Sequence, residues 1–381
     1  MKKIKWLLIL SVAFSISACD DAEEIVEEIN SAIELSGEVN SPMVLEDHIE
    51  GGYDYYVTGK WSLNADVTIM PGVSIMMKSA SSIRVNTSGS LNAVGADVKP
   101  IILEGEMNAK GAWGEIVFDN SNNTKNVLTY VTISDGGGES YSQSMIEIKG
   151  NSQVKITNSI IENSGEYGIQ LVNDYSVLSE FSNNIVTDCN GYPVYIYANQ
   201  LNVIKGTNVF YDNGDFNYVM VESGDISQNE TWEKLTAPVL LSSPYNTISA
   251  DVTVAPGAAF VMGEDALLTV EPEGSLNMTG TVNERITFSS KIESPGYFQG
   301  IIYENSNNPL NQVHYVDISH GGGGYNEANL RISGSSRIVV GNSSLNYSSN
   351  YGIYVSRDAT FTDDGANTFT GNADIDVYIQ Q

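Results

Sequence analysis

The stretch ADVTIMPG at Ala65–Gly72 returns almost unchanged as ADVTVAPG at Ala250–Gly257. The second stretch begins 185 residues after the first, and other phrases repeat in the same order at the same offset. The clearest further pairs are GSLNAVG (89–95) with GSLNMTG (274–280), DNSNNT (119–124) with ENSNNP (304–309), and YVTIS (130–134) with YVDIS (315–319). Chance similarity would not preserve this order, so the matches indicate an internal duplication.

Within each copy, short runs rich in valine and isoleucine alternate with turn residues. In the first phrase, Val67 and Ile69 point to one face and the residues between them to the other, which is the two-residue period of a strand. No helical pattern of twelve residues follows Leu35. The helices that connect parallel strands in an ordinary α/β sheet are therefore missing.

Parallel strands without helices can return through corners, and the chain then winds into a coil. The crossover preference of parallel strands makes the coil right-handed, and on the order of 25 residues per turn gives roughly a dozen turns. A hairpin sandwich is the alternative, but the regular Asn-Gly or Asp-Gly hairpins it requires are mostly absent. Asparagines at corners tolerate left-handed dihedrals, and their side chains can hydrogen-bond the backbone of the neighbouring turn. The candidate corner asparagines, which favour the coil over the sandwich, are Asn158, Asn163, Asn342 and Asn346.

Segments such as VTIMPGVSIMM (67–77) and WGEIVFDNS (113–121) resemble the right-handed parallel β-helix proteins of the pectin-lyase-like superfamily. They are most similar to bacterial secreted and lipoprotein members without an assigned activity. The resemblance covers residues 53–381 and implies an all-β, single-stranded right-handed parallel β-helix solenoid. We expect copy 1 at 53–235 and copy 2 at 236–381, joined in one continuous solenoid. The resemblance implies little about activity, because this fold hosts lyases, hydrolases, adhesins and binding proteins.

The opening sequence MKKIKWLLILSVAFSISAC has a basic start, an apolar run and small residues before Cys19. The run is shorter than a membrane span and has signal-peptide proportions. Its end, ISAC, resembles the lipobox of bacterial lipoproteins. This implies a signal peptide at 1–18 and acylation of Cys19 by diacylglycerol and a palmitate-type chain. We expect a lipidated tether at 19–52, in which the isoleucine spacing over Ala22–Leu35 predicts a short amphipathic helix that either covers the solenoid end or is a weakly helical linker.

The formal net charge of −29 indicates which partners to expect. Such a surface repels nucleic acid and anionic headgroups, so we expect no nucleic-acid partner. The expected membrane partner is the bacterial envelope, which the chain reaches through its lipid anchor. Asp20 resembles an inner-membrane retention signal, whereas the acidic cluster after Cys19 resembles a surface-export signal. We expect the outer membrane or cell surface, with the inner membrane as the alternative.

The catalytic patterns that the resemblance would imply are missing from the sequence. No segment gathers two aspartates and an arginine as in pectate lyases, and His320 precedes the Asp363-Asp364 pair, which reverses the order in polygalacturonases. Cys19 is assigned to the anchor, so Cys189 has no disulfide partner, and it is expected to be a buried structural cysteine. We predict no catalytic residue and no cofactor; a calcium-stabilised rod is the alternative, suggested by Asp363, Asp364, Asp374 and Asp376.

The chain has 21 tyrosines, and exposed aromatic side chains along a rod can stack on sugar rings. Partly buried corner positions are the alternative for most of them. The candidate binding surface consists of Trp113, Tyr130, Tyr141, Phe298, Tyr315, His320 and Tyr325. We therefore expect a non-catalytic envelope protein that binds, adheres to or scaffolds carbohydrate or another surface polymer. A polysaccharide lyase or glycoside hydrolase is the alternative.

Overall fold

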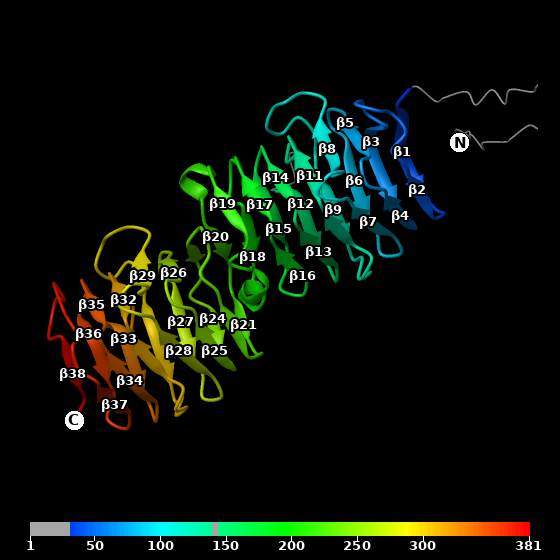
Figure 1. The fold of residues 1–381 in the computed structure, drawn as a ribbon. Coiled ribbons are helices and arrows are strands. Elements are labelled where there is room, and N and C mark those ends of the chain that lie inside the picture. The colour runs from blue at the N-terminus through cyan, green and yellow to red at the C-terminus, as the bar shows by residue number, and fades with distance from the viewer. Residues whose placement is uncertain (1–30, 139–143) are drawn as a thin grey trace, which may run out of the picture.

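The computed structural model describes residues 31–138 and 144–381 (Figure 1). Over these residues the chain is an all-β solenoid of about 14 turns, and its strands pair in parallel along four sheets. Each turn places strands on three faces, which we number in the order that the chain reaches them. The predicted fold class is confirmed, with slightly more turns than expected.

Copy 1 builds its three faces as follows. The first face contains the start of β1 (Ile33–Val39) and of β3 (Tyr55–Leu63), then β5 (Ser74–Met77), β8 (Ile101–Gly105), β11 (Val131–Ser134), β14 (Ile160–Glu162), β17 (Ile185–Thr187) and β19 (Val209–Tyr211). The second face contains the ends of β1 and β3, then β6 (Ser82–Val85), β9 (Ile116–Asp119), β12 (Ser144–Lys149), β15 (Tyr167–Leu171) and β18 (Val194–Ile196). The third face contains β2 (Met43–Leu45), β4 (Asp66–Ile69), β7 (Ser90–Val94), β10 (Val127–Thr129), β13 (Gln153–Thr157) and β16 (Val177–Ser182).

Copy 2 repeats this order of strands. Its first face contains β20 (Val219–Val221), β23 (Val239–Leu241), β26 (Ala259–Met262), β29 (Ile286–Ser290), β32 (Val316–Ser319) and β35 (Ser344–Asn346). Its second face contains β21 (Gly224–Ile226), β24 (Asn246–Ile248), β27 (Leu267–Val270), β30 (Gly300–Glu304), β33 (Ala328–Ser333), β36 (Tyr351–Val355) and β38 (Val377–Ile379). Its third face contains β22 (Glu230–Trp232), β25 (Asp251–Val254), β28 (Ser275–Thr279), β31 (Gln312–His314), β34 (Arg337–Gly341) and β37 (Thr360–Asp363).

The junction between the copies shifts the faces by one position. Two 3-10 turns, η1 (Ala198–Val203) and η2 (Gly214–Phe216), lie in this stretch. Strand β18, on the second face of copy 1, pairs with β20, which pairs with β23 and then β26 on the first face of copy 2. Equivalent faces of the two copies therefore point to different sides of the rod. The predicted boundary at residue 236 is untested; strands β20, β21 and β22 precede it and are grouped with copy 2 because they pair with its strands β23, β24 and β25.

The core follows the two-residue alternation read from the sequence. Val67 and Ile69 are 0% and 1% exposed, and inward side chains from successive turns form one continuous apolar cluster. Aromatic rings stack in the same way inside copy 2, where the Phe260 and Phe288 rings lie 4.6 Å apart. Burial of each such side chain contributes roughly 1.5–3 kcal/mol. The stacked core therefore stabilises each turn against its neighbours.

The corners carry the left-handed residues that the asparagines predicted. Asn158, Asn163 and Asn342 have φ values of 52°, 57° and 53°, which Asn tolerates better than most residues. At the fourth predicted position the left-handed residue is Tyr347, with φ 53°, and not Asn346. Three of the four corner predictions are thus confirmed.

The predicted N-terminal helix over Ala22–Leu35 lies mostly outside the described residues. Its last part is wrong, because Ile33, Glu34 and Leu35 belong to β1 and pair in parallel with β3. The inward-facing Leu35 is 6% exposed, so the apolar side chains serve a strand and not a helical stripe. No helix within residues 31–138 and 144–381 is long and apolar enough to cross a membrane.

Candidate functional site

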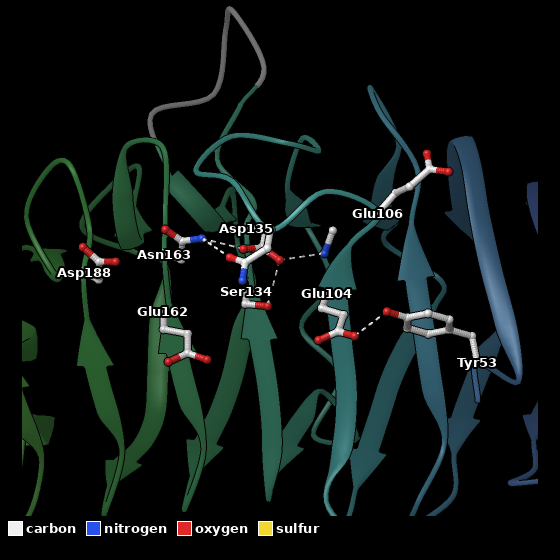
Figure 2. A pocket seen from close by; sticks show the side chains of 10 residues that line it. Tyr53, Glu104, Glu106, Ser134, Asp135, Glu162, Asn163 and Asp188 are labelled. Carbon is white, nitrogen blue, oxygen red and sulfur yellow. Dashed lines mark hydrogen bonds between the residues drawn. The ribbon is translucent and has the colours of Figure 1, made fainter. Parts of the chain in front are cut away.

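Carboxylates gather in an open cleft where first-face strands of copy 1 end (Figure 2). The cleft has a volume of about 530 Å³. We call it the acidic cleft; its lining residues are Tyr53, Glu104, Gly105, Glu106, Asn108, Ser134, Asp135, Glu162, Asn163 and Asp188. It lies over β8, β11, β14 and the corner after β17, so it follows the long axis of the solenoid.

Strand register aligns the side chains on the floor of the acidic cleft. Ser134 is paired with Glu162, and the pairing of β8 with β11 brings Glu104 opposite Ser134. Neighbouring strands lie about 4.8 Å apart, so these outward side chains form a row with that spacing. Burial raises the pKa of the Glu162 carboxyl, and the nearby charges of Asp135, Asp188 and Glu104 raise it further. The carboxylates along the acidic cleft therefore repel one another.

Asp135 is fixed at the corner after β11. Its φ is 70° and its side chain is buried. One carboxylate oxygen accepts hydrogen bonds from the Gly105 amide at 3.1 Å and the Ser134 hydroxyl at 3.2 Å, and the other accepts one from the Asn163 amide at 2.5 Å. These bonds join three successive turns. Asp135 is thus a positioned acceptor and part of the corner's structure.

Tyr53 closes one end of the acidic cleft and donates a hydrogen bond to Glu104 at 2.5 Å. That bond is the main reason why the pKa of Tyr53 rises to about 12. Asp54 anchors the loop that carries Tyr53: its buried carboxylate accepts the backbone amides of His48 and Ile49, each at 2.7 Å. Tyr53 also lines two neighbouring hollows of about 890 and 530 Å³. The hollow surface therefore continues beyond the acidic cleft.

The segment after β8 forms a wall of the acidic cleft. The Lys110 ammonium lies 2.8 Å from Asp188 and donates to Asn190 at 3.1 Å, so the segment reaches the corner after β17. A Cβ on Gly138 would lie 2.0 Å from the Gly111 carbonyl oxygen. The glycine-rich corner thus allows close backbone approach, which is how the wall packs against it.

Two of the seven sequence-predicted binding positions are buried and cannot form a binding surface. Trp113 and Phe298 are 1% and 0% exposed; this part of the prediction is wrong, because both side chains fill the core beside the glycine-rich corners. Tyr130 and Tyr315 are left-handed corner residues with φ values of 51° and 52°. Their role in binding remains a prediction.

The remaining predicted positions are scattered. Tyr325 is 97% exposed, and the His320 ring stacks on Tyr347 with centroids 5.2 Å apart. Tyr141 and Cys19 lie outside the described residues. Among the described residues of the predicted set, none lines the acidic cleft.

Two groups of tyrosines that face outward were not among the predicted site residues. The first tyrosine platform consists of Tyr167, Tyr192, Tyr195 and Phe216, and its neighbouring ring centroids are 5.3–5.6 Å apart. The second tyrosine platform consists of Tyr351, Tyr354 and Tyr378, with centroids 4.8–6.0 Å apart. The signal was present in the sequence, because YGIQL and VYIY in copy 1 correspond to YGIYV and VYIQ in copy 2.

The described residues contain no group of three or more His, Cys, Asp or Glu placed to hold a metal ion. Near the C-terminus, one Asp363 oxygen accepts bonds from the Gly365 amide and the Asn367 side chain, each at 2.8 Å. The calcium alternative therefore rests only on the aspartates in the C-terminal sequence. Cys189 is 3% exposed, and burial raises its pKa to about 12. The prediction that it is a buried cysteine is confirmed.

Comparison with known proteins yields one match. Residues 30–250, more than half of the chain, match the family described as "Right handed beta helix region". No curated protein matches the chain, and no solved structure matches it.

Proposed function

The chain belongs to the right-handed β-helix family, and from this premise we propose that it is a rigid, envelope-anchored scaffold whose acidic cleft binds an extended, hydroxyl-rich polymer. The observation that carries the proposal is the row of acceptors formed by Glu104, Ser134 and Glu162 along the solenoid axis. Sugar hydroxyls can donate hydrogen bonds to such a row of acceptors. Hydrogen bonds to a charged carboxylate are stronger than those to a neutral acceptor. A rigid strand lattice keeps the acceptors in place before binding.

Charge narrows the polymer class. The protein carries a net charge of −29. The lining of the acidic cleft includes four other carboxylates besides Asp188, which is paired with Lys110 at the edge, and no lysine or arginine. A polyanion would meet repulsion both at long range and on contact. The proposed ligand is therefore a neutral polysaccharide.

The anchor is a separate part of the proposal and rests on the sequence ISAC before residue 20. Acylated Cys19 would hold the solenoid at a bacterial membrane surface, with 19–52 as the tether. Expression of the wild type and of Cys19→Ser in a bacterial host tests this directly. We expect the wild type in the detergent phase of a phase separation and the variant in the aqueous phase. Equal partitioning of both would contradict the anchor.

Binding is tested by depletion of the protein on a panel of insoluble neutral polysaccharides. The variants Glu104→Gln and Glu162→Gln keep the size of the side chains and remove the charged acceptors. We expect at least tenfold weaker binding, which corresponds to about 1.4 kcal/mol. Ser289→Ala, which changes the copy 2 counterpart of Glu104, is the matched control and should bind like the wild type. Unchanged binding by both glutamine variants would refute a role for the acidic cleft.

Hydrolysis of the polymer is the second candidate, and one specific feature favours it. The raised pKa of Glu162 suits a general acid, and Glu104 is a carboxylate close enough to contribute to that rise. The same polysaccharide panel distinguishes binding from hydrolysis. New reducing ends that disappear with Glu162→Gln would assign a hydrolase, whereas intact polymer would support the scaffold.

A further inference from the structure

The two tyrosine platforms are equivalent parts of the duplicated chain. Tyr167 on β15 and Tyr195 on β18 stack with centroids 5.6 Å apart and planes 16° apart. Tyr351 on β36 and Tyr378 on β38 occupy the same places in copy 2, and their rings stack at 4.8 Å and 19°. Each pair joins neighbouring strands of the second face of its copy. The duplication has therefore kept a stacked tyrosine pair where other outward side chains have changed.

The surroundings of the pairs show this divergence. Glu147 and Gln170, outward on the second face of copy 1, are replaced in copy 2 by Arg331 and Tyr354. The Arg331 guanidinium lies 4.1 Å from the centre of the Tyr354 ring. In copy 1 the Tyr195 hydroxyl donates to Glu222 at 2.6 Å. In copy 1 a carboxylate thus binds a member of the pair directly, whereas in copy 2 Arg331 packs on Tyr354, whose ring lies 5.2 Å from that of Tyr378.

The pairs remain partly open to solvent. The four paired side chains are of intermediate exposure; they are Tyr167, Tyr195, Tyr351 and Tyr378. They lie on a sheet face where tyrosine hydroxyls and charged groups also contact water. A preordered aromatic surface with hydrogen-bonding groups at its rim matches a pyranose, which has an apolar face and polar edges. Ordering the rings in the free protein also lowers the entropy that binding would lose.

The face shift at the junction separates the platforms around the rod. Because β18 pairs with β20 and so continues into the first face of copy 2, the second faces of the two copies are not in line. β15 and β18 belong to a different sheet from β36 and β38 and therefore lie on a different side of the solenoid. A single straight polymer segment along one face cannot contact both platforms.

From this arrangement we infer that each tyrosine platform is a sugar-stacking site, so that one chain carries two such sites on different sides of the rod, in addition to the acidic cleft. The ligand class is the neutral polysaccharide of the proposed function, on which the inference rests. The platforms supply ring contacts that the acidic cleft lacks. Separate sites on separate sides allow one chain to hold two segments of the polymer.

The test uses calorimetric titration with soluble neutral hexasaccharides, in a Glu104→Gln and Glu162→Gln background that removes the acidic cleft. We expect two sites per chain in this background, one site after Tyr195→Ala or Tyr378→Ala, and at least tenfold weaker binding in the double variant. Tyr195→Leu keeps apolar bulk without the ring and should behave like Tyr195→Ala. Tyr245→Ala, at a tyrosine that is 75% exposed and lies outside both platforms and the predicted binding surface, is the control.

The outcomes separate this inference from the proposed function. If the acidic cleft variants weaken binding while the double tyrosine variant binds like its parent, the platforms are not sugar sites. If the tyrosines matter and the acidic cleft does not, the inference stands and the location given in the proposed function is wrong. Self-association that Tyr378→Ala abolishes, measured by sedimentation without sugar, would instead assign the platform to contact between copies of the chain and overturn the inference.

Discussion

The acidic cleft of copy 1 has a counterpart in copy 2 with the same backbone and different chemistry. The first follows β8, β11 and β14, and the second follows β29, β32 and β35, which pair in the same order. The carboxylates are replaced in copy 2; the corresponding pairs are Glu104 and Ser289, Asp135 and His320, Glu162 and Asn346, and Asp188 and Gly371. The side-chain chemistry therefore varies on a corner scaffold that the duplication preserved.

The corner at Asp135 and His320 shows how strongly the backbone is kept. Their φ values are 70° and 71°, although one side chain is an anion and the other an imidazole. Asp135 bonds across three turns, whereas the His320 ring stacks on Tyr347. Backbone conformation is thus a property of the fold, and the side chain at the same corner differs between the copies.

Replacing a buried corner asparagine should cause the largest loss of stability, and the loss should be equal in both copies. Asn126 and Asn311 are each 1% exposed, and their amides donate to Ser121 and Ser306 carbonyls at 2.9 Å. Alanine at either position leaves several buried backbone groups without partners, so we expect a loss of about 3 kcal/mol in the free energy of unfolding. Denaturant unfolding measures this.

The control for the asparagine pair is Glu162→Gln, which alters the acidic cleft without removing a buried bond. Its unfolding free energy should stay within about 0.5 kcal/mol of the wild type. If Asn126→Ala destabilises strongly and Asn311→Ala does not, the two copies do not share the same structural corner.

The next largest effect, a pH-dependent change in stability, is expected at Glu230, a carboxyl that has no counterpart in copy 1. Glu230 on β22 occupies the place of Met43 on β2: they pair with Val252 and Val67, the equivalent residues of the doubled phrase. Its side chain accepts a bond from the Trp232 indole at 2.5 Å. Burial raises its pKa to about 7, against smaller opposing effects of Trp232 and the Lys205 charge.

A raised carboxyl pKa means that the folded state favours the protonated form. The stabilisation from this preference is full below the ordinary value near 4.5 and is lost as pH rises through 7. We expect Glu230→Gln, which keeps an acceptor for the Trp232 indole and removes the ionisable carboxyl, to increase stability by about 1–2 kcal/mol at pH 8.5 and much less at pH 5. The difference in melting temperature between variant and wild type, measured across this range, checks it. A difference independent of pH would contradict the raised pKa.

The smallest effect is expected at Cys189, where copy 2 has Asn372. The Asn372 side chain accepts the Ser348 amide at 2.9 Å and donates to the Leu345 carbonyl at 3.0 Å, which a thiol cannot reproduce fully. Cys189→Asn should therefore stabilise the chain by about 1 kcal/mol. Thermal unfolding of Cys189→Asn and the reverse change Asn372→Cys measures it. Stabilisation by the reverse change would contradict the equivalence of these corners.

Much of the fold could be predicted because its rules are local. The alternation at Val67 and Ile69 predicted strands, and left-handed corners followed from Asn158 and Asn163. The end of the predicted N-terminal helix is wrong because Leu35, read from the sequence as the end of an amphipathic helix, is an inward residue of β1, which begins at Ile33.

The acidic cleft could not be predicted from local patterns. Its residues come from corners of separate turns, from Tyr53 to Asp188, and their proximity depends on the number of residues in each turn. Trp113 was misassigned because alternation breaks at a corner, where the sequence does not distinguish inward from outward. The tyrosine pairs were accessible in principle, since Tyr195 and Tyr378 follow the alternation of their strands.

The comparison of the copies is tested most directly by giving the acidic cleft the side chains of its counterpart. The double variant Glu104→Ser with Glu162→Asn carries the residues of copy 2 on the backbone of copy 1. A binding isotherm on the neutral polysaccharide retained best by the wild type is the measurement. The account predicts at least tenfold weaker binding by a protein that still unfolds in one cooperative thermal transition. Binding equal to that of the wild type would contradict it.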